Sequence, residues 1–64
     1  MNLYRLVEII TMENGNVSCT DIMCFPDNLS ALNFLTSFKP GRESTLIPGA
    51  TLDYSIIEMI LILQ

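Results

Sequence analysis

The sequence predicts a small α+β domain in which one helix packs on one face of a three-stranded, mostly antiparallel sheet, with the element order β-β-α-β. Three observations support this fold: a hairpin signal between two apolar segments, a helical pattern of apolar residues after them, and a final apolar segment rich in isoleucine. The 64 residues allow one domain, which we assign to residues 1–64. A domain of this size buries only about 60% of its unfolded surface, so we expect a small core.

Two strands joined by a tight turn are expected at the start of the chain. Leu3–Met12 is rich in Leu, Val and Ile and contains no strand breaker, which is typical of a strand. Asn14-Gly15 follows, and both residues tolerate the positive φ angles of a two-residue hairpin turn. Val17–Phe25 is then the returning strand, and Pro26 ends it because proline has no N–H to donate.

A helix should follow the hairpin. Asp27 or Asn28 can cap its first free N–H groups, and Lys39-Pro40-Gly41 should end it with a cation in the last turn. Apolar residues recur at helical spacing, and we interpret them as the side that packs in the core. These residues are Leu29, Ala31, Leu32, Phe34, Leu35 and Phe38.

The rest of the chain predicts a loop and a third strand. Residues 41–51 have no periodicity and contain the turn signal Pro48-Gly49. The isoleucines of Leu52–Leu63 favour a strand, with a buried helix as the alternative. A helical connection from the second strand to the third most simply crosses over the first, which predicts the spatial order 2-1-3.

The register of the hairpin decides on which face of the sheet each side chain lies. With a two-residue loop at Asn14-Gly15, Glu8 lies directly opposite Asp21, whereas a three-residue loop would change the register. Because burying an unpaired carboxylate costs several kcal/mol, we expect the helix to cover the other face. The residues expected beneath the helix are Val7, Ile9, Ile22, Ile57, Met59 and Leu61.

The face expected to stay open combines carboxylates with large apolar side chains, a mixture that favours a partner-binding surface. Like charges directly opposite each other destabilise a strand pair, so either Glu8 or Asp21 should hold its proton more tightly in the folded state. The fold should then be more stable near about pH 5 than near about pH 7.5. The residues of this expected partner-binding face are Tyr4, Leu6, Glu8, Ile10, Asp21, Met23, Phe25, Ile56, Glu58 and Ile60.

Catalytic and metal chemistry find little support. Glu8, Asp21 and Glu58 could together bind Ca²⁺ or Mg²⁺, but no dedicated loop supports such a site, and we expect no metal and no cofactor. The chain contains no histidine, so no Ser-His or Cys-His pair can form. Its glycines are isolated turn residues rather than a phosphate-binding loop. We therefore predict that the protein is not an enzyme.

Composition limits the classes of partner and the cellular location that we expect. Half of the residues are hydrophobic and the mean hydropathy is +0.45, which favours a homodimer or larger assembly. The net charge of −4 argues against direct binding to nucleic acid or to anionic membranes. Cys19 and Cys24 should point to opposite faces of one strand and so form no disulfide. No targeting segment is evident and the apolar stretch 56–63 is too short to span a membrane, so we expect a cytoplasmic protein.

The leading hypothesis is a small non-enzymatic protein-binding module, of inhibitor or adaptor type, that uses the acidic-apolar sheet face to bind a protein, with a basic surface as one option. The first alternative is a structural subunit that self-assembles into a homo-oligomer. The second is an acidic nucleic-acid mimic that blocks a basic cleft of a host enzyme, which is weaker because the seven carboxylates are scattered along the chain. In size and acidity alone, the chain resembles the small inhibitors of phages and other mobile elements.

Overall fold

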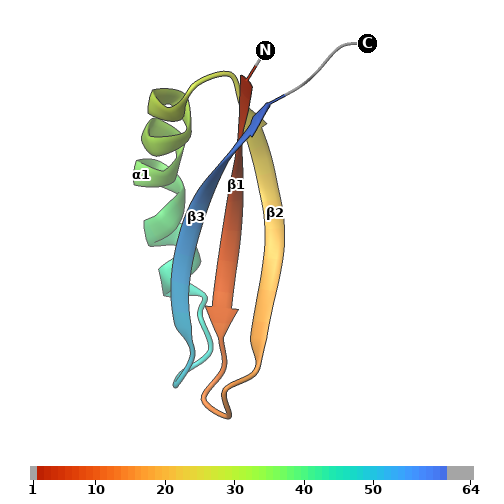
Figure 1. Cartoon of the computed structure of the whole chain (residues 1–64). Coiled ribbons are helices and arrows are strands. Elements are labelled where there is room, and N and C mark those ends of the chain that lie inside the picture. Colours follow the sequence, from red (N-terminus) through yellow and green to blue (C-terminus); the bar gives the residue numbers. More distant parts are fainter. Residues whose placement is uncertain (1, 61–64) are drawn as a thin grey trace.

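The computed structural model describes residues 2–60 and contains, in that range, strands β1 (Asn2–Thr11), β2 (Val17–Phe25) and β3 (Thr51–Ile60) and one helix, α1 (Asn28–Ser44). The strands form one antiparallel sheet in the order β2-β1-β3. Figure 1 shows α1 lying along one side of this sheet, with the hairpin loop and the loop before β3 at the same end. The predicted α+β class, element order and strand order are confirmed.

The loop of the hairpin has three residues rather than the expected two. Met12 pairs with Asn16 through its N–H, which donates to the Asn16 carbonyl at 2.7 Å, and Gly15 N–H donates to the Met12 carbonyl at 2.9 Å. Gly15 has a φ of +92°, as the last position of a three-residue hairpin loop requires. The predicted hairpin is confirmed, and its predicted loop length is wrong.

A β-bulge in β2 changes the register halfway along the hairpin. Leu6 pairs with Met23 but the next residue, Val7, pairs with Asp21, so Ile22 is left without a partner. The expected pairs therefore hold from Tyr4 to Leu6 and are wrong from Val7 onward. In particular, Glu8 lies opposite Thr20 and not opposite Asp21.

Helix α1 begins as predicted and ends later than predicted. Asp27 is the N-cap, and its Oδ1 accepts a hydrogen bond of 2.7 Å from the Ser30 N–H. The helix then continues through Pro40 to Ser44, so its expected end at Lys39-Pro40-Gly41 is wrong. Proline removes one N–H donor from the hydrogen bonds of the helix. The helix nevertheless continues past Pro40, and its last turn is held to the sheet by the hydrogen bond from Arg42 to Glu8.

The core lies between α1 and the side of the sheet that carries the even-numbered residues of β1. Leu6 and Ala31 have no exposed surface and Phe25 is 8% exposed. Partly buried hydrophobic residues complete the cluster: Ile22, Phe34, Leu35, Tyr54 and Ile56.

The predicted apolar side of the helix is only partly correct. Phe34 and Phe38 pack in the core with ring centroids 5.0 Å apart, and Phe38 meets Tyr54 at 6.3 Å. Leu29 and Leu32, in contrast, are 66% and 45% exposed on the outer side of the helix. The core side of α1 therefore follows a spacing of three and four from Ala31, and it does not include every leucine in the pattern.

The helix covers the opposite face from the one expected. Leu6, predicted to lie on the open face, is at the centre of the core, whereas Ile57, predicted to lie under the helix, is 39% exposed. The expectation failed because Glu8 is buried together with a cation supplied by the helix, which removes the penalty that had been assigned to this face.

The last described element is a strand, as predicted, and not a buried helix. β3 ends at Ile60 in the described range, so Leu61 and the remainder of the expected strand to Leu63 lie outside it. The predicted Pro48-Gly49 turn is confirmed, because Ala50 N–H donates to the Ile47 carbonyl at 3.1 Å and Gly49 has a φ of +88°. Within residues 2–60, no helix is long and apolar enough to cross a membrane.

Candidate functional site

A partly buried ion pair joins the helix to the sheet. Glu8 of β1 is 2% exposed, and Arg42 in the last turn of α1 binds it with two parallel hydrogen bonds. Arg42 Nε donates to Glu8 Oε2 at 2.9 Å and Nη2 donates to Oε1 at 2.8 Å. Tyr54 of β3 donates its hydroxyl to Glu8 Oε2 at 2.8 Å. These three charge-assisted bonds compensate the carboxylate for its lost hydration.

The electrostatics of this cluster keep Glu8 ionised and Tyr54 protonated at neutral pH. The hydrogen bonds from Arg42 hold the pKa of Glu8 below its usual range, although burial alone acts in the other direction. Burial, followed by the adjacent Glu8 carboxylate, raises the pKa of Tyr54 to about 12. Glu8 is therefore an ionised acceptor and Tyr54 a neutral donor, which is the arrangement of a stable contact.

Sequence reasoning placed Arg42 in a loop and did not connect it with Glu8. A signal was nevertheless present, because Phe34, Phe38 and Arg42 follow each other at intervals of four residues and so share one side of a helix. The unexpected part was the continuation of the helix beyond Pro40.

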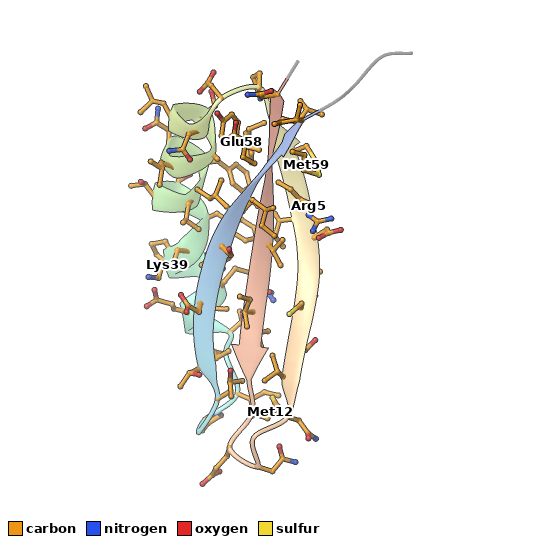
Figure 2. The ribbon with its side chains drawn as sticks, in the orientation of Figure 1. Arg5, Met12, Lys39, Glu58 and Met59 are labelled. Atoms are coloured by element: carbon orange, nitrogen blue, oxygen red, sulfur yellow. The ribbon has the colours of Figure 1, made fainter. Side chains whose placement is uncertain are left out.

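The other side of the sheet is not covered by any element that the structure describes, and we call it the open face. Its members are the odd-numbered residues of β1 and their direct cross-strand partners, whose side chains share that side. Figure 2 shows Arg5, a member of this face, and Lys39, which lies on the helix. The open face consists of Leu3, Arg5, Val7, Ile9, Thr11, Val17, Cys19, Asp21, Cys24, Thr51, Asp53, Ser55, Ile57 and Met59.

The open face is mainly apolar and contains one exposed ion pair. Arg5 Nε lies 3.5 Å from Asp21 Oδ1, and the two side chains are 38% and 67% exposed. Exposed pairs of this kind add little stability, about 0–1 kcal/mol. Arg5 Nε is also shielded from solvent without a hydrogen-bond acceptor among residues 2–60. Because this N–H has no exposed surface, a partner on this face would contact the exposed remainder of the Arg5 side chain.

The bulge brings both cysteines to the open face. Cys19 pairs with Ile9 and Cys24 pairs with Arg5, and these two β1 residues point to the same side. The expectation that the thiols lie on opposite faces is therefore wrong, because the bulged residue Ile22 adds a position between them. Both cysteines are free, as predicted, and both are exposed.

The ten residues of the expected partner-binding face are divided by the structure. Leu6, Glu8 and Phe25 are buried under α1, so their expected placement on an exposed face is wrong. Asp21 is the member that lies on the open face, through its pairing with Val7. Tyr4, Ile10 and Ile56 are partly buried, and Met23, Glu58 and Ile60 are exposed. A role of these exposed side chains in partner binding stays a prediction.

The three acids that the sequence offers as metal ligands, Glu8, Asp21 and Glu58, are separated by their own contacts. Glu8 binds Arg42, Asp21 faces Arg5, and Glu58 Oε1 accepts a hydrogen bond of 2.9 Å from the Asn2 side chain. The described part of the chain holds no group of three or more Cys, Asp or Glu side chains arranged to bind a metal ion.

Fold and face together define a two-layer α+β domain with one helix, one covered sheet face and one open sheet face. Comparisons of this chain with protein-family models, with curated proteins and with solved structures find no match. The site must accordingly be interpreted from its own geometry.

Proposed function

We propose that this protein is a small non-enzymatic binding module, of inhibitor or adaptor type, that binds another protein through the open face. The observation that supports this most is the composition of that face, where Ile57, Cys19 and Cys24 are exposed and Leu3, Ile9 and Met59 are only partly buried, although Val7 at its centre is buried. Monomeric proteins rarely leave a continuous apolar patch of this kind without an interaction that uses it.

The dimensions of the open face suit a small protein interface. Strands of nine and ten residues, at about 3.4 Å per residue and about 4.8 Å between strands, give a platform of about 34 Å by about 14 Å. When the surface of its side chains is included, the area of this platform lies at the lower end of the range for specific protein interfaces. Some transient signalling complexes have interfaces of this size. The exposed part of the Arg5 side chain would supply the polar contact that sets the orientation of the partner.

Self-assembly is the second candidate, and the strand order favours it. Because β1 is central, both β2 and β3 are edge strands with free backbone groups along one side. Two copies could stack their open faces in the aligned manner of a β-sandwich, about 10 Å apart. We expect this form, a homodimer or larger, if the protein is purified without a partner.

Nucleic-acid mimicry receives less support. Of the seven carboxylates, Glu8, Asp21, Asp27 and Glu58 already have partners within the chain. A mimic needs a dense array of free acids to replace phosphates. We also propose a cytoplasmic location, which is in keeping with two free thiols on an exposed surface.

The test compares two matched substitutions on opposite sides of the molecule. Ile57→Asp places a charge on the open face, and Leu29→Asp places the same charge on the outer side of α1, at positions that are 39% and 66% exposed. Urea unfolding first establishes that both variants fold. Light scattering and affinity capture from host lysate then measure self-assembly and partner binding.

Loss of capture or of the dimer in Ile57→Asp, with both retained in Leu29→Asp, is the expected result. A wild type that is monomeric at about 100 µM and still captures a partner selects the binding module, because weak association shows in the micromolar to millimolar range. A dimer that Ile57→Asp dissociates selects self-assembly. Retention of every interaction by Ile57→Asp would remove the open face as the site.

A further inference from the structure

A cavity lies on the covered side of the sheet, at the end where the loops meet. A cavity of about 300 Å³ separates the sheet from the last turn of α1 and the loop that follows it. Its floor is formed by Ile10 and by the two residues that flank Ile10 across the strands, Ser18 and Leu52. Its cover includes Leu46 and other residues of the loop before β3. Met12, which also lines it, marks this end of the sheet in Figure 2.

The polar group that matters in this cavity is the guanidinium of Arg42. An arginine has five N–H donors, and Glu8 accepts from Nε and Nη2. No acceptor within residues 2–60 binds the Nη1 group, although Arg42 lines the cavity and its side chain is 43% exposed. The cavity therefore combines aliphatic walls with an arginine whose guanidinium keeps N–H groups that Glu8 does not occupy, a combination typical of small-molecule sites.

The charge of the site selects a neutral ligand over an anion. Glu8 already neutralises Arg42 through two hydrogen bonds. A ligand carboxylate on Nη1 would lie beside the Glu8 carboxylate, and like charges at such distances repel strongly in a partly buried site. The net charge of −4 adds to this repulsion. A carbonyl oxygen, in contrast, accepts the free N–H groups without bringing a charge.

We propose that this cavity binds a neutral amphipathic molecule, with its carbonyl on Arg42 and its aliphatic chain against Ile10, Leu46 and Leu52. The volume of about 300 Å³ equals that of about ten water molecules in the liquid, each about 30 Å³. A ligand of about ten non-hydrogen atoms fits this space, and octanamide is such a molecule. Ligands of this size in a good pocket reach dissociation constants of about 1 mM or tighter.

The experiment titrates octanamide into the protein and follows backbone amide shifts by NMR. We expect saturable shifts at Ile10, Leu46 and Leu52, and binding at least about tenfold weaker for octanoate, which has the same size and a negative charge. Ala50→Phe should abolish binding because residue 50 lines the cavity and the ring fills it. Leu46→Phe serves the same purpose if Ala50→Phe does not fold.

Leu32→Ala, on the outer side of α1, is the matched control and should bind octanamide like the wild type. Ile57→Asp should also leave this binding unchanged, because the open face lies on the other side of the sheet, so this site and the protein-binding face are tested separately. Absence of shifts at saturating octanamide would overturn the proposal. Equal binding of octanoate, or binding that survives both cavity-filling substitutions, would also do so.

Discussion

Removal of the cation beside Glu8 should destabilise the fold more than removal of Glu8 itself. Arg42→Met keeps an unbranched side chain but leaves the Glu8 carboxylate, which is 2% exposed, without its cation and with the Tyr54 hydroxyl as its remaining donor. An uncompensated buried charge of this kind costs about 3–5 kcal/mol. A domain of 64 residues, at about 0.05–0.15 kcal/mol per residue, has a total stability of about 3–10 kcal/mol. Much of the stability therefore depends on this contact.

The effect should depend on pH in a defined direction. Arg42 lowers the pKa of Glu8 in the folded state below its usual value of 4.5. The pair therefore contributes stability that is fully present above about pH 4.5 and is lost as the pH falls through the lowered folded pKa. Without Arg42, burial raises the pKa of Glu8, so the variant instead regains stability on acidification. The earlier expectation of greater stability near about pH 5 rested on Glu8 facing Asp21, a pairing that the register excludes.

Urea unfolding of wild type, Arg42→Met and Glu8→Gln at about pH 7.5 and about pH 4 measures both effects. With a slope of about 1 kcal/mol per molar urea for so small a chain, the midpoint of Arg42→Met should fall by about 3–5 M at the higher pH. Glu8→Gln should lose less, since the half-exposed guanidinium can return to water. The reasoning is refuted if Glu8→Gln is as damaging as Arg42→Met at the higher pH, or if acidification leaves the deficit of Arg42→Met unchanged. A variant too unstable to fold at the higher pH should still fold near about pH 4.

Substitutions at four further positions test the remaining structure by urea or thermal unfolding. Gly49→Ala should cost about 1–2 kcal/mol because Gly49 has a φ of +88°, whereas Gly41→Ala, in the helix with open space around it, should stabilise by about 0.5–1 kcal/mol; equal signs would contradict the turn geometry. Leu6→Ala should cost about 2–5 kcal/mol because Leu6 is fully buried, and a negligible loss would place it back on an exposed face. Asp27→Ala should lower the midpoint by removing the acceptor for Ser30 N–H, with Asp27→Asn as the control that retains a cap.

The elements of the fold could be predicted because local signals decide them. Asn14-Gly15 between two apolar segments predicted the hairpin, and the Asp27 cap predicted the start of the helix. The end of the helix could not be predicted in this way, because proline and glycine are helix breakers by their local preference. A tertiary contact of Arg42 accompanies the continuation of the helix past both of them.

The register of the hairpin was the least predictable feature, because one extra loop residue and one bulge each shift it by one position. The hairpin loop contains one residue more than expected, which shifts every pair next to the loop by one position. The unpaired Ile22 then shifts the remaining pairs back by one position. Leu6 therefore pairs with Met23 as expected, because the two shifts cancel. Only the segment between the loop and the bulge changes face, and that segment contains Asp21. A single-sequence pattern has the same period on both sides of a bulge and does not reveal it.

The choice of the covered face depends on Glu8, because hydrophobicity does not distinguish the two sides of this sheet. Leu6 and Ile10 alternate with Val7 and Ile9 along β1, so each side offers apolar surface to the helix. Docking α1 over Val7 and Ile9 would move Arg42 away from Glu8. We therefore propose that the Glu8–Arg42 pair selects the covered face, at the cost of a polar group in the core.

The double substitution Glu8→Met with Arg42→Met tests this role directly. Replacing a buried ion pair with apolar residues of similar volume is often neutral or stabilising by about 1–4 kcal/mol, so the double variant should recover the stability that Arg42→Met loses. It should also lose the preference for one face, seen as broadened or doubled NMR resonances of Leu6 and Val7. Sharp single resonances with the wild-type contacts between Phe34 and Phe25 would show instead that packing alone orients the helix. The broadened outcome would explain why a chain with two apolar sheet faces leaves one particular face open for a partner.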